Sequence, residues 1–402
     1  MNKLIKILII FPMDPFGEKI GGIGTFLRNF VKYAPDYLDI EWVGISSNTK
    51  ARPTGKWHTG KLGSKEFKFL PILYVPEENI RSKIPLSLKF TLALLKNRSK
   101  ISLEDKILEF HRIEPSIIFR KTNNKKVLFV HGDVRDLYNP HGEMKWSKFP
   151  WLYFQIEKML ISRMSRVFVV REDGVNFYKE RYPFIAERFL FLPTFVDVDT
   201  FYPYSDAKRE EQKLHFLNMQ NLSADSRLIF FVGRLEGAKD PLLLIETFNY
   251  INKNDPNSIL LIVGDGALKK EMIMKVAQYK LDSKVHFMGA LPQEKVAEIM
   301  RISDVFLLTS AFEGMPMSVL EALASGLPVV STDVGEVKRV VINELSGMIT
   351  AEHKAYILGN LVLRVLNNRK VFPPTNCVSS IKDYTAKCVL SDVYQMHYNL
   401  EV

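Results

Sequence analysis

The chain has 402 residues, which is enough for two domains of ordinary size. Its 47% hydrophobic and 25% charged content is that of a globular protein, and no run reaches the roughly 18–20 apolar residues of a membrane span. Only two cysteines, Cys377 and Cys388, are present, so a disulfide framework is excluded and a reducing cytoplasmic location is favoured.

The net charge of +10 is concentrated in the first half of the chain. Residues 1–200 hold 33 Lys and Arg against 22 Asp and Glu, whereas residues 201–402 hold 22 against 23. Such a field attracts anions, for example a phosphorylated acceptor or an acidic membrane surface. Solubilising surface charge is the alternative, and nucleic acid is not among the partners that we expect.

Strand and helix patterns fill the first half. We predict strands at 6–11, 40–47, 116–120, 126–133, 166–170 and 188–192, and helices at 25–33, 104–113, 151–163 and 173–182. Residues 51–65 are rich in Gly, Lys and Thr and are predicted to be a mobile loop. A basic amphipathic helix over 81–100 could lie on an anionic membrane, although an internal helix with lysines at its ends is equally compatible with the pattern.

A glycine-rich turn joins the first strand to the first helix. It contains Gly21, Gly22 and Gly24, and such turns let backbone amides approach a phosphate closely. The turn is too long for a dinucleotide fingerprint and lacks the Gly-Lys-Ser/Thr of a P-loop, so a tight structural turn is the alternative.

His131 follows a buried strand and is followed by Gly132. A side chain at that position points out of the strand end rather than into the core, although a lone histidine is more often structural. Three nearby polar residues could meet an acceptor because of their proximity, namely Arg135, Asp136 and Tyr138.

Asp197-x-Asp199 offers paired carboxylates but has no glycine-rich donor site beside it, so we expect no metal there. Residues 203–226 are polar and are predicted to be a linker or the entry to a second domain. After them we predict strands at 228–232, 259–263, 285–288, 305–308 and 329–331, separated by helices at 241–251, 268–279, 294–302 and from Met317. Repeated strand–helix units predict a parallel sheet with helices on both faces.

Arg234 and Lys239 lie five residues apart in the loop after the strand at 228–232. Two cations at the carboxyl end of a parallel strand suit a diphosphate, since charge-assisted hydrogen bonds contribute about 1.5–3 kcal/mol each. Two solvated loop cations are the alternative. Gly266 ends the next strand at the same edge of the sheet.

The segment from Glu313 to Glu321 contains a Gly/Pro turn and enters a helix near Met317. Loop amides and a positive helix terminus favour an anionic or polyhydroxylated ligand. The alternative for Glu321 is structural, because Ser318-x-x-Glu321 has the form of a capping box.

This segment resembles the E-x7-E signature of retaining, nucleotide-sugar-dependent glycosyltransferases of the GT-B fold, family 4. The Gly-Arg-Leu…Lys motif at 233–239, the His-Gly at 131–132 and the Gly-Gly at 21–22 are similar to further motifs of that family. The resemblance implies two Rossmann-like doubly wound α/β domains that face each other across a cleft. It places an acceptor-binding domain at 1–200 and a donor-binding domain at 201–384, with a C-terminal helix, about 385–402, packed back onto the first.

The resemblance also implies roles for individual residues. Arg234 and Lys239 would stabilise the departing diphosphate, Glu313 would orient the sugar, Glu321 would hold the ribose and His131 would lie beside the donor sugar. Further contacts to the donor are implied for Gly21, Gly22, Gly266, Met315, Pro316, Met317 and Ser318. The donor would be a UDP- or GDP-linked sugar, no metal or other cofactor would be needed, and the acceptor would be a saccharide or a lipid-linked molecule at the inner face of a membrane.

Two other classes stay open. One is a GT-B enzyme of a different reaction, either a sugar-nucleotide epimerase or a phosphorylase. The other is a non-catalytic relative that only binds a nucleotide, which the presence of Glu313, Arg234 and Lys239 argues against.

Overall fold

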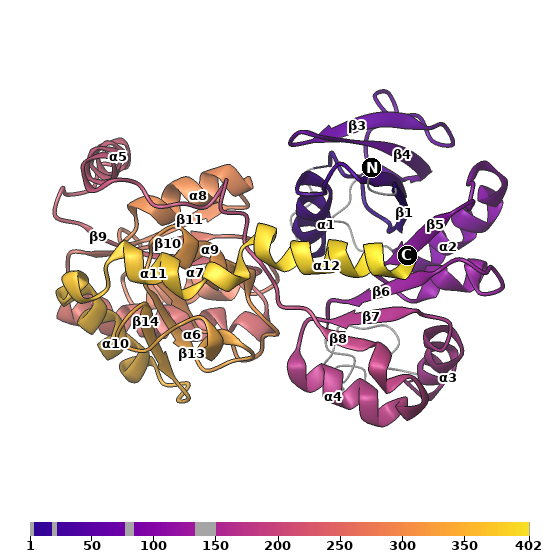
Figure 1. The fold of residues 1–402 in the computed structure, drawn as a ribbon. Coiled ribbons are helices and arrows are strands. Elements are labelled where there is room, and N and C mark those ends of the chain that lie inside the picture. The colour runs from indigo at the N-terminus through magenta and orange to yellow at the C-terminus, as the bar shows by residue number, and fades with distance from the viewer. Residues whose placement is uncertain (1–3, 18–21, 77–83, 133–149, 402) are drawn as a thin grey trace. The chain divides into compact units, whose positions relative to one another are not determined.

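The protein is described from a computed structural model, which covers residues 4–17, 22–76, 84–132 and 150–401. Its chain divides into two compact units (Figure 1). Unit 1 contains residues 1–193 and 386–402, and unit 2 contains residues 194–385.

Eight strands form the sheet of unit 1, in the order β3-β4-β2-β1-β5-β6-β7-β8. They are β1 (Ile5–Ile10), β2 (Leu38–Ser46), β3 (His58–Leu62), β4 (Lys65–Tyr74), β5 (Lys106–Phe110), β6 (Lys126–Val130), β7 (Arg166–Val169) and β8 (Phe189–Phe191). All neighbours are parallel except the β3–β4 hairpin. The direction of winding reverses between β1 and β5, and open α/β sheets bind ligands at the carboxyl end of such a switch point.

Four helices between these strands flank the sheet, namely α1 (Gly22–Lys32), α2 (Leu86–Lys96), α3 (Pro150–Ile161) and α4 (Glu172–Arg181). Ile7, Leu8, Ile9 and Ile10 of β1 are all fully buried. A continuous apolar run of this kind is what a strand needs when both faces of its sheet are covered.

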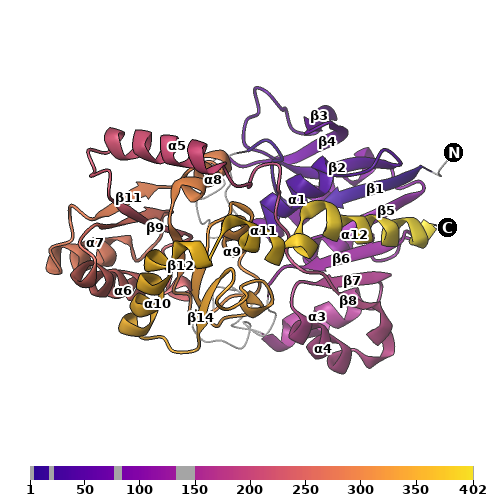
Figure 2. The same cartoon turned by 60° about the vertical axis from the view of Figure 1, so that its left-hand side comes forward.

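The last helix, α12 (Ala386–Glu401), returns to unit 1 and packs against α1 and β1 (Figures 1 and 2). The Tyr394 hydroxyl donates to the Phe30 carbonyl at 2.7 Å. Val389, Leu390 and Val393 of the same helix are buried.

Unit 2 has a six-stranded, wholly parallel sheet in the order β11-β10-β9-β12-β13-β14. Its strands are β9 (Arg227–Val232), β10 (Ser258–Val263), β11 (Val285–Gly289), β12 (Val305–Leu308), β13 (Val329–Thr332) and β14 (Gly347–Thr350). Here the switch point lies between β9 and β12.

The helices of unit 2 are α5 (Asp206–Met219), α6 (Pro241–Asn254), α7 (Lys269–Gln278), α8 (Gln293–Ile302), α9 (Met317–Ala324), α10 (Ala355–Asn367) and α11 (Pro374–Ser380). Along β9, Leu228 and Phe230 join the apolar cluster of α8 and α9, whereas Ile229 and Phe231 join that of α6, α7 and α10. Successive side chains of the strand therefore alternate between the two faces of the sheet and contribute to both apolar clusters. The predicted fold class, two doubly wound α/β domains, is confirmed.

Two local predictions in unit 1 are wrong. Residues 104–113, predicted to be helical, contain β5. Of residues 116–120, predicted to be a strand, all but the last lie in the 3-10 helix Glu114–Phe119. Every residue of β5 is buried, including Lys106 and Glu109. These two charged residues interrupt the apolar pattern that would have identified the strand. They can be buried because each has a partner from another part of the fold.

A predicted mobile loop and a segment predicted to be a linker or the entry to a second domain both contain regular structure. Residues 51–65 include β3, and residues 203–226 include α5. Only Leu217 of α5 is buried, so the helix lacks an apolar stripe. Ion pairs attach it instead, since Arg209 and Lys213 contact Asp304 at 2.6 and 2.8 Å.

Candidate functional site

The loops after β9 and β12 bring a cation and a carboxylate together in unit 2. Lys239 ends the 3-10 turn Gly237–Lys239, and its Nζ donates to Oε1 of Glu313. Ser310 Oγ donates to the same oxygen at 2.8 Å. The two charged side chains are only 18% and 12% exposed. Because β9 and β12 are the strands of the switch point, this pair lies where the topology predicts a ligand.

Backbone contacts hold these two loops to each other. Thr309 Oγ1 donates to the carbonyls of Lys239 and Asp240 at 3.1 and 3.0 Å, and the Ala311 amide donates to the Ala238 carbonyl. Asp240 has a left-handed backbone, with φ of 42°, and its carboxylate accepts from the Leu243 amide at the start of α6. The position of Lys239 is therefore fixed by the loop after β12 on one side and by the start of α6 on the other.

Close backbone packing explains Gly266. A Cβ atom on this glycine would lie 2.5 Å from the Leu235 carbonyl oxygen, so no larger residue fits between the loops after β9 and β10. Gly335 is similar, because a Cβ there would lie 1.9 Å from the Gly314 oxygen. Packing alone accounts for both glycines, and the predicted contact of Gly266 with a nucleotide stays a prediction.

Glu321 lies in the second turn of α9, and it is not part of a capping box. The helix begins at Met317 after Pro316, and no side chain caps it. Gln293 Nε2 of α8 donates to Oε1 of Glu321 at 3.4 Å. Burial raises the pKa of Glu321 to about 7, although Gln293 and Lys239 act in the opposite direction. Glu321 does not cap the helix, and burial disfavours its charged form. A carboxyl group kept in such a position is a candidate for ligand binding.

The other predicted residues of unit 2 surround this pair of loops. Met315 and Pro316 are buried, whereas Met317 and Ser318 are half-buried at the start of α9. Arg234 differs from Lys239, because its side chain is 67% exposed and its guanidinium pairs with Glu236 at 2.7 Å. The roles assigned to these residues stay predictions.

In unit 1, Gly22 is exposed and opens α1. Residues 11–17, which follow β1, are anchored by Asp14, which is fully buried and accepts from Ser47 and Arg52. Gly21 and the proposed acceptor residues Arg135, Asp136 and Tyr138 lie outside the described residues.

His131 follows β6 and contacts a buried network that the sequence reasoning missed. Its Nε2 lies 2.7 Å from Nδ1 of His111, and Nε2 of His111 lies 2.9 Å from Oε1 of Glu109. The other oxygen of Glu109 lies 3.1 Å from Nε2 of His397 on α12. Burial and the neighbouring His111 hold the pKa of His131 well below its usual range. The Glu-x-His spacing on a strand could have revealed the pair, but 104–113 was predicted to be a helix.

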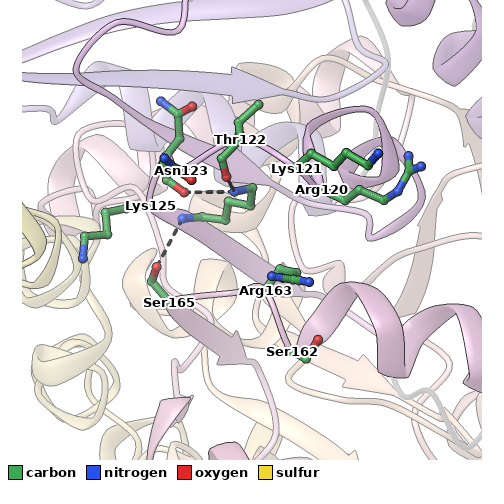
Figure 3. Close-up of a pocket in the computed structure, with 10 residues that line it drawn as sticks. Arg120, Lys121, Thr122, Asn123, Lys125, Ser162, Arg163 and Ser165 are labelled. Atoms are coloured by element: carbon green, nitrogen blue, oxygen red, sulfur yellow. Dashed lines mark hydrogen bonds between the residues drawn. The ribbon is translucent and has the colours of Figure 1, made fainter.

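A polar hollow of about 490 Å³ lies elsewhere in unit 1 (Figure 3). It is lined by residues 120–126 and by Ser162, Arg163 and Ser165, which follow α3, and none of the predicted site residues is among them. Across the described ranges, no group of three His, Cys, Asp or Glu could hold a metal ion. No helix in the described part of the chain is long and apolar enough to cross a bilayer.

Comparison with known proteins finds a family model that matches part of the chain. Residues 216–376 match the family model described as glycosyl transferases group 1. Over 180 residues the chain is 29% identical to the UDP-Gal:alpha-D-GlcNAc-diphosphoundecaprenol alpha-1,3-galactosyltransferase of Escherichia coli, covering 44% of this chain and 45% of that protein. The chain spans about half the length of the curated relatives it matches.

Solved structures match over nearly the whole chain. Sucrose-phosphate synthase from Thermosynechococcus elongatus has a TM-score of 0.77 at 18% identity, covering 98% of this chain and 99% of that one. The HepE protein of Anabaena, solved in complex with UDP-glucose, has a TM-score of 0.72 at 14% identity, with 98% and 99% covered. These likenesses establish the fold.

Proposed function

We propose that this chain is a retaining glycosyltransferase, because residues 216–376 match the glycosyl transferases group 1 model and the fold is GT-B. It would move a sugar from a nucleotide-diphosphate sugar to an acceptor hydroxyl. The observation that carries the proposal is the Lys239–Glu313 pair at the switch point of unit 2. The pKa of Glu321, on the helix α9 that follows this loop, is raised.

In the proposed reaction, the bond between the anomeric carbon and the donor diphosphate breaks. A new bond forms between that carbon and the acceptor oxygen, on the same face of the sugar. The acceptor proton passes to the departing diphosphate, so no external base is required. Lys239, together with Arg234, would neutralise the negative charge that develops on the diphosphate.

The ion pair between Lys239 and Glu313 suggests how the donor would enter. A diphosphate would take Lys239 as its partner, which releases the Glu313 carboxylate to accept hydrogen bonds from sugar hydroxyls. Ser310 already donates to that carboxylate and would keep it oriented during the exchange. The amides of Met315 to Ser318 would hold the sugar, and Glu321 would accept from the ribose.

We propose a UDP-linked donor, because UDP-sugars are named for two of the similar proteins. A saccharide or lipid-linked acceptor in polysaccharide or glycolipid assembly is proposed on the same basis, since the Escherichia coli relative is named for a diphosphoundecaprenol acceptor. The positive charge of residues 1–200 suits an anionic acceptor and association with the inner face of a membrane. Protein cations would replace a metal, so the proposed reaction is metal-independent.

The first test is a thermal-shift screen with UDP, GDP and ADP and their common sugars, in which we expect UDP compounds to stabilise the protein. Purified protein is then incubated with the stabilising donor and candidate acceptors, and NMR of the product reports the anomeric configuration. Donor supplied alone separates the rivals, because an epimerase would convert its sugar, and added phosphate would activate a phosphorylase. Stabilisation without transfer or hydrolysis of any donor would favour a protein that only binds nucleotides.

A further inference from the structure

Glu109 lies at the centre of a set of three imidazoles in unit 1, of which those of His111 and His397 are buried. Glu109 and His111 are two residues apart on β5 and its extension, so both side chains project from the same face of the sheet. His131 extends β6, which is the neighbouring strand. His397 arrives from α12, 288 residues later in the chain than Glu109. Glu109, His111 and His397 are at most 3% exposed, so bulk water does not replace their contacts.

Counting hydrogens defines the state of this network. An ionised carboxylate only accepts, so Nε2 of His111 and Nε2 of His397 must both carry hydrogens. Nδ1 of His397 lies 2.8 Å from the Val393 carbonyl, which also only accepts. His397 therefore joins Glu109 to the Val393 carbonyl on its own helix. Burial alone would raise the pKa of Glu109, but the hydrogen bonds from His111 and His397 lower it overall.

The same count extends to His131. With its hydrogen on Nε2, a neutral His111 presents the lone pair of Nδ1, so His131 must donate from Nε2 across the 2.7 Å contact. His131 then keeps its own lone pair on Nδ1. Ring packing fixes the orientation, because His111 stacks on Phe129 with 4.7 Å between centroids and Phe26 meets His131 edge-on at 4.9 Å.

We propose that Glu109 and His111 are positioning residues that hold His131 as the neutral tautomer with hydrogen on Nε2, and that His397 of α12 completes the network. His131 thereby offers Nδ1 as a hydrogen-bond acceptor to a donor-sugar hydroxyl. The part played by the sugar rests on the proposed function, whereas the tautomer does not.

The test uses the full-length protein with ¹⁵N-labelled histidine, with the His131 signals assigned by comparison with His131→Ala. We expect Nε2 of His131 to be protonated and Nδ1 to be unprotonated. His111→Phe keeps the stacked ring but removes the acceptor, so the His131 tautomer should change. The exposed His215→Phe is the matched control and should leave it unchanged. A wild-type His131 with hydrogen on Nδ1 overturns the proposal whether or not the variant folds.

A kinetic cycle provides the second readout. His111→Phe should lower kcat/KM by about 10–100-fold in the wild-type background and have little further effect in His131→Ala, because both changes disable one contact. Equal losses in the two backgrounds would indicate a merely structural role for His111 and overturn the proposal. If His131→Ala itself has full activity while the tautomer is as expected, the assignment of His131 to the sugar fails and the positioning network stands.

The polar hollow of unit 1 carries a second, independent inference. Five cationic residues line it, namely Arg120, Lys121, Lys125, Lys126 and Arg163, and no carboxylate is among the described residues around it (Figure 3). Elsewhere in unit 1, the buried Lys106 is paired with Glu41 and the half-buried Arg52 with Asp14. Lys126 is 3% exposed, and its ammonium donates to the carbonyls of Thr122 and Asn124 at 2.6 and 3.0 Å.

We infer that this hollow binds a phosphate group. The side-chain amide of Asn123 and the hydroxyl of Ser165, which accepts from the Lys126 amide, supply further donors around the cations. Burial and the nearby Arg163 lower the pKa of Lys126, so its charged form is disfavoured there. A bound anion would stabilise that charged form.

Calorimetric titration with inorganic phosphate and pyrophosphate tests this site, and vesicles with and without phosphatidic acid test whether the phosphate belongs to a lipid. The double variant Lys125→Ala/Arg163→Ala should bind at least about 10-fold more weakly, as expected for losing charge-assisted bonds. Lys89→Ala/Lys96→Ala on α2 is the matched control. Affinities equal to wild type in the first variant for every probe, or no binding of any probe to the wild type, would overturn the inference.

Discussion

At the scale of single residues, the contact between Lys239 and Glu313 joins two loops that are 74 residues apart in the chain. A cation and a carboxylate that neutralise each other in the free protein can each take a new partner when a diphosphate sugar binds. The pair is largely buried, so its electrostatic interaction is stronger than that of an exposed pair.

Lys239→Ala is expected to lower kcat/KM by about 10–150-fold, from a loss of roughly 1.5–3 kcal/mol of charge-assisted bonding to the departing diphosphate. Initial rates over a range of donor concentrations measure the effect. Lys295→Ala, which removes a 61% exposed cation of the same unit, serves as the control and should change little. A Lys239→Ala enzyme as active as this control would refute the role in diphosphate binding.

Glu321→Gln should show a stability change that depends on pH. The pKa of Glu321 is raised from 4.5 to about 7 in the folded protein, so the native state holds a proton that the unfolded state has lost. The stability of the wild type therefore falls as pH rises from 4.5 to 7. The variant has no such loss, and at pH 8 its Tm should be about 2–4 °C higher, for a gain on the order of 1 kcal/mol.

Near pH 4.5 the Tm values of the Glu321→Gln variant and the wild type should converge. Thermal denaturation at both pH values checks this, and UDP titration at pH 8 should show weaker binding to the variant. The same Tm difference at both pH values would mean that Glu321 is not the titrating group.

At the scale of elements, sequence patterns identified strands and helices whose burial follows an apolar period. The β9 to β12 units were predicted with boundaries close to those observed, because each strand is almost wholly apolar. β5 was missed because Lys106 and Glu109 are buried in it, and their partners come from distant segments. For the same reason Glu109, His111 and His397 could not be grouped from the sequence, whereas Lys239 and Glu313 could be, through family motifs.

The attachment of α5 also depends on buried charge. Asp304 accepts from Arg209 and Lys213 of α5 and from the Leu228 amide, at 2.6, 2.8 and 2.7 Å. Burial alone would raise the pKa of Asp304, but the charges of Lys213 and Arg209 lower it overall. The stability from this contact is therefore complete above pH 3.8 and is lost as pH falls below it.

Asp304→Asn should destabilise unit 2 by about 3 kcal/mol, because it leaves two partly buried cations without their carboxylate. Urea denaturation near neutral pH measures the loss. In the control Glu298→Gln, the altered group forms an exposed pair with Lys295, so the change should stay within about 0.5 kcal/mol. If the two variants are equally stable, ion pairs are not what holds α5.

At the scale of the whole molecule, unit 1 is built from two separate stretches of chain. Ending the chain at Thr385 would remove α12, which exposes Phe30 and Phe129 and leaves Glu109 without His397. We expect this truncation to lower the unfolding temperature of unit 1 by several degrees and to leave unit 2 intact, because unit 2 contains none of α12. Calorimetry of the truncated chain, with proteolysis to identify the unit that unfolds, provides the measurement. Unchanged unfolding of unit 1 would show that α12 is dispensable for its stability.

The return of α12 has a consequence for biosynthesis. A ribosome makes most of unit 1 first, but the final sixteen-residue helix emerges only after all of unit 2 has been translated. At about 5–20 residues per second, roughly 190 residues of unit 2 impose a delay of some 10–40 s. During that interval the nascent N-terminal sheet lacks the apolar side chains of α12, and its central acid Glu109 has His111 but not His397 as a partner, so chaperones would be needed at this stage.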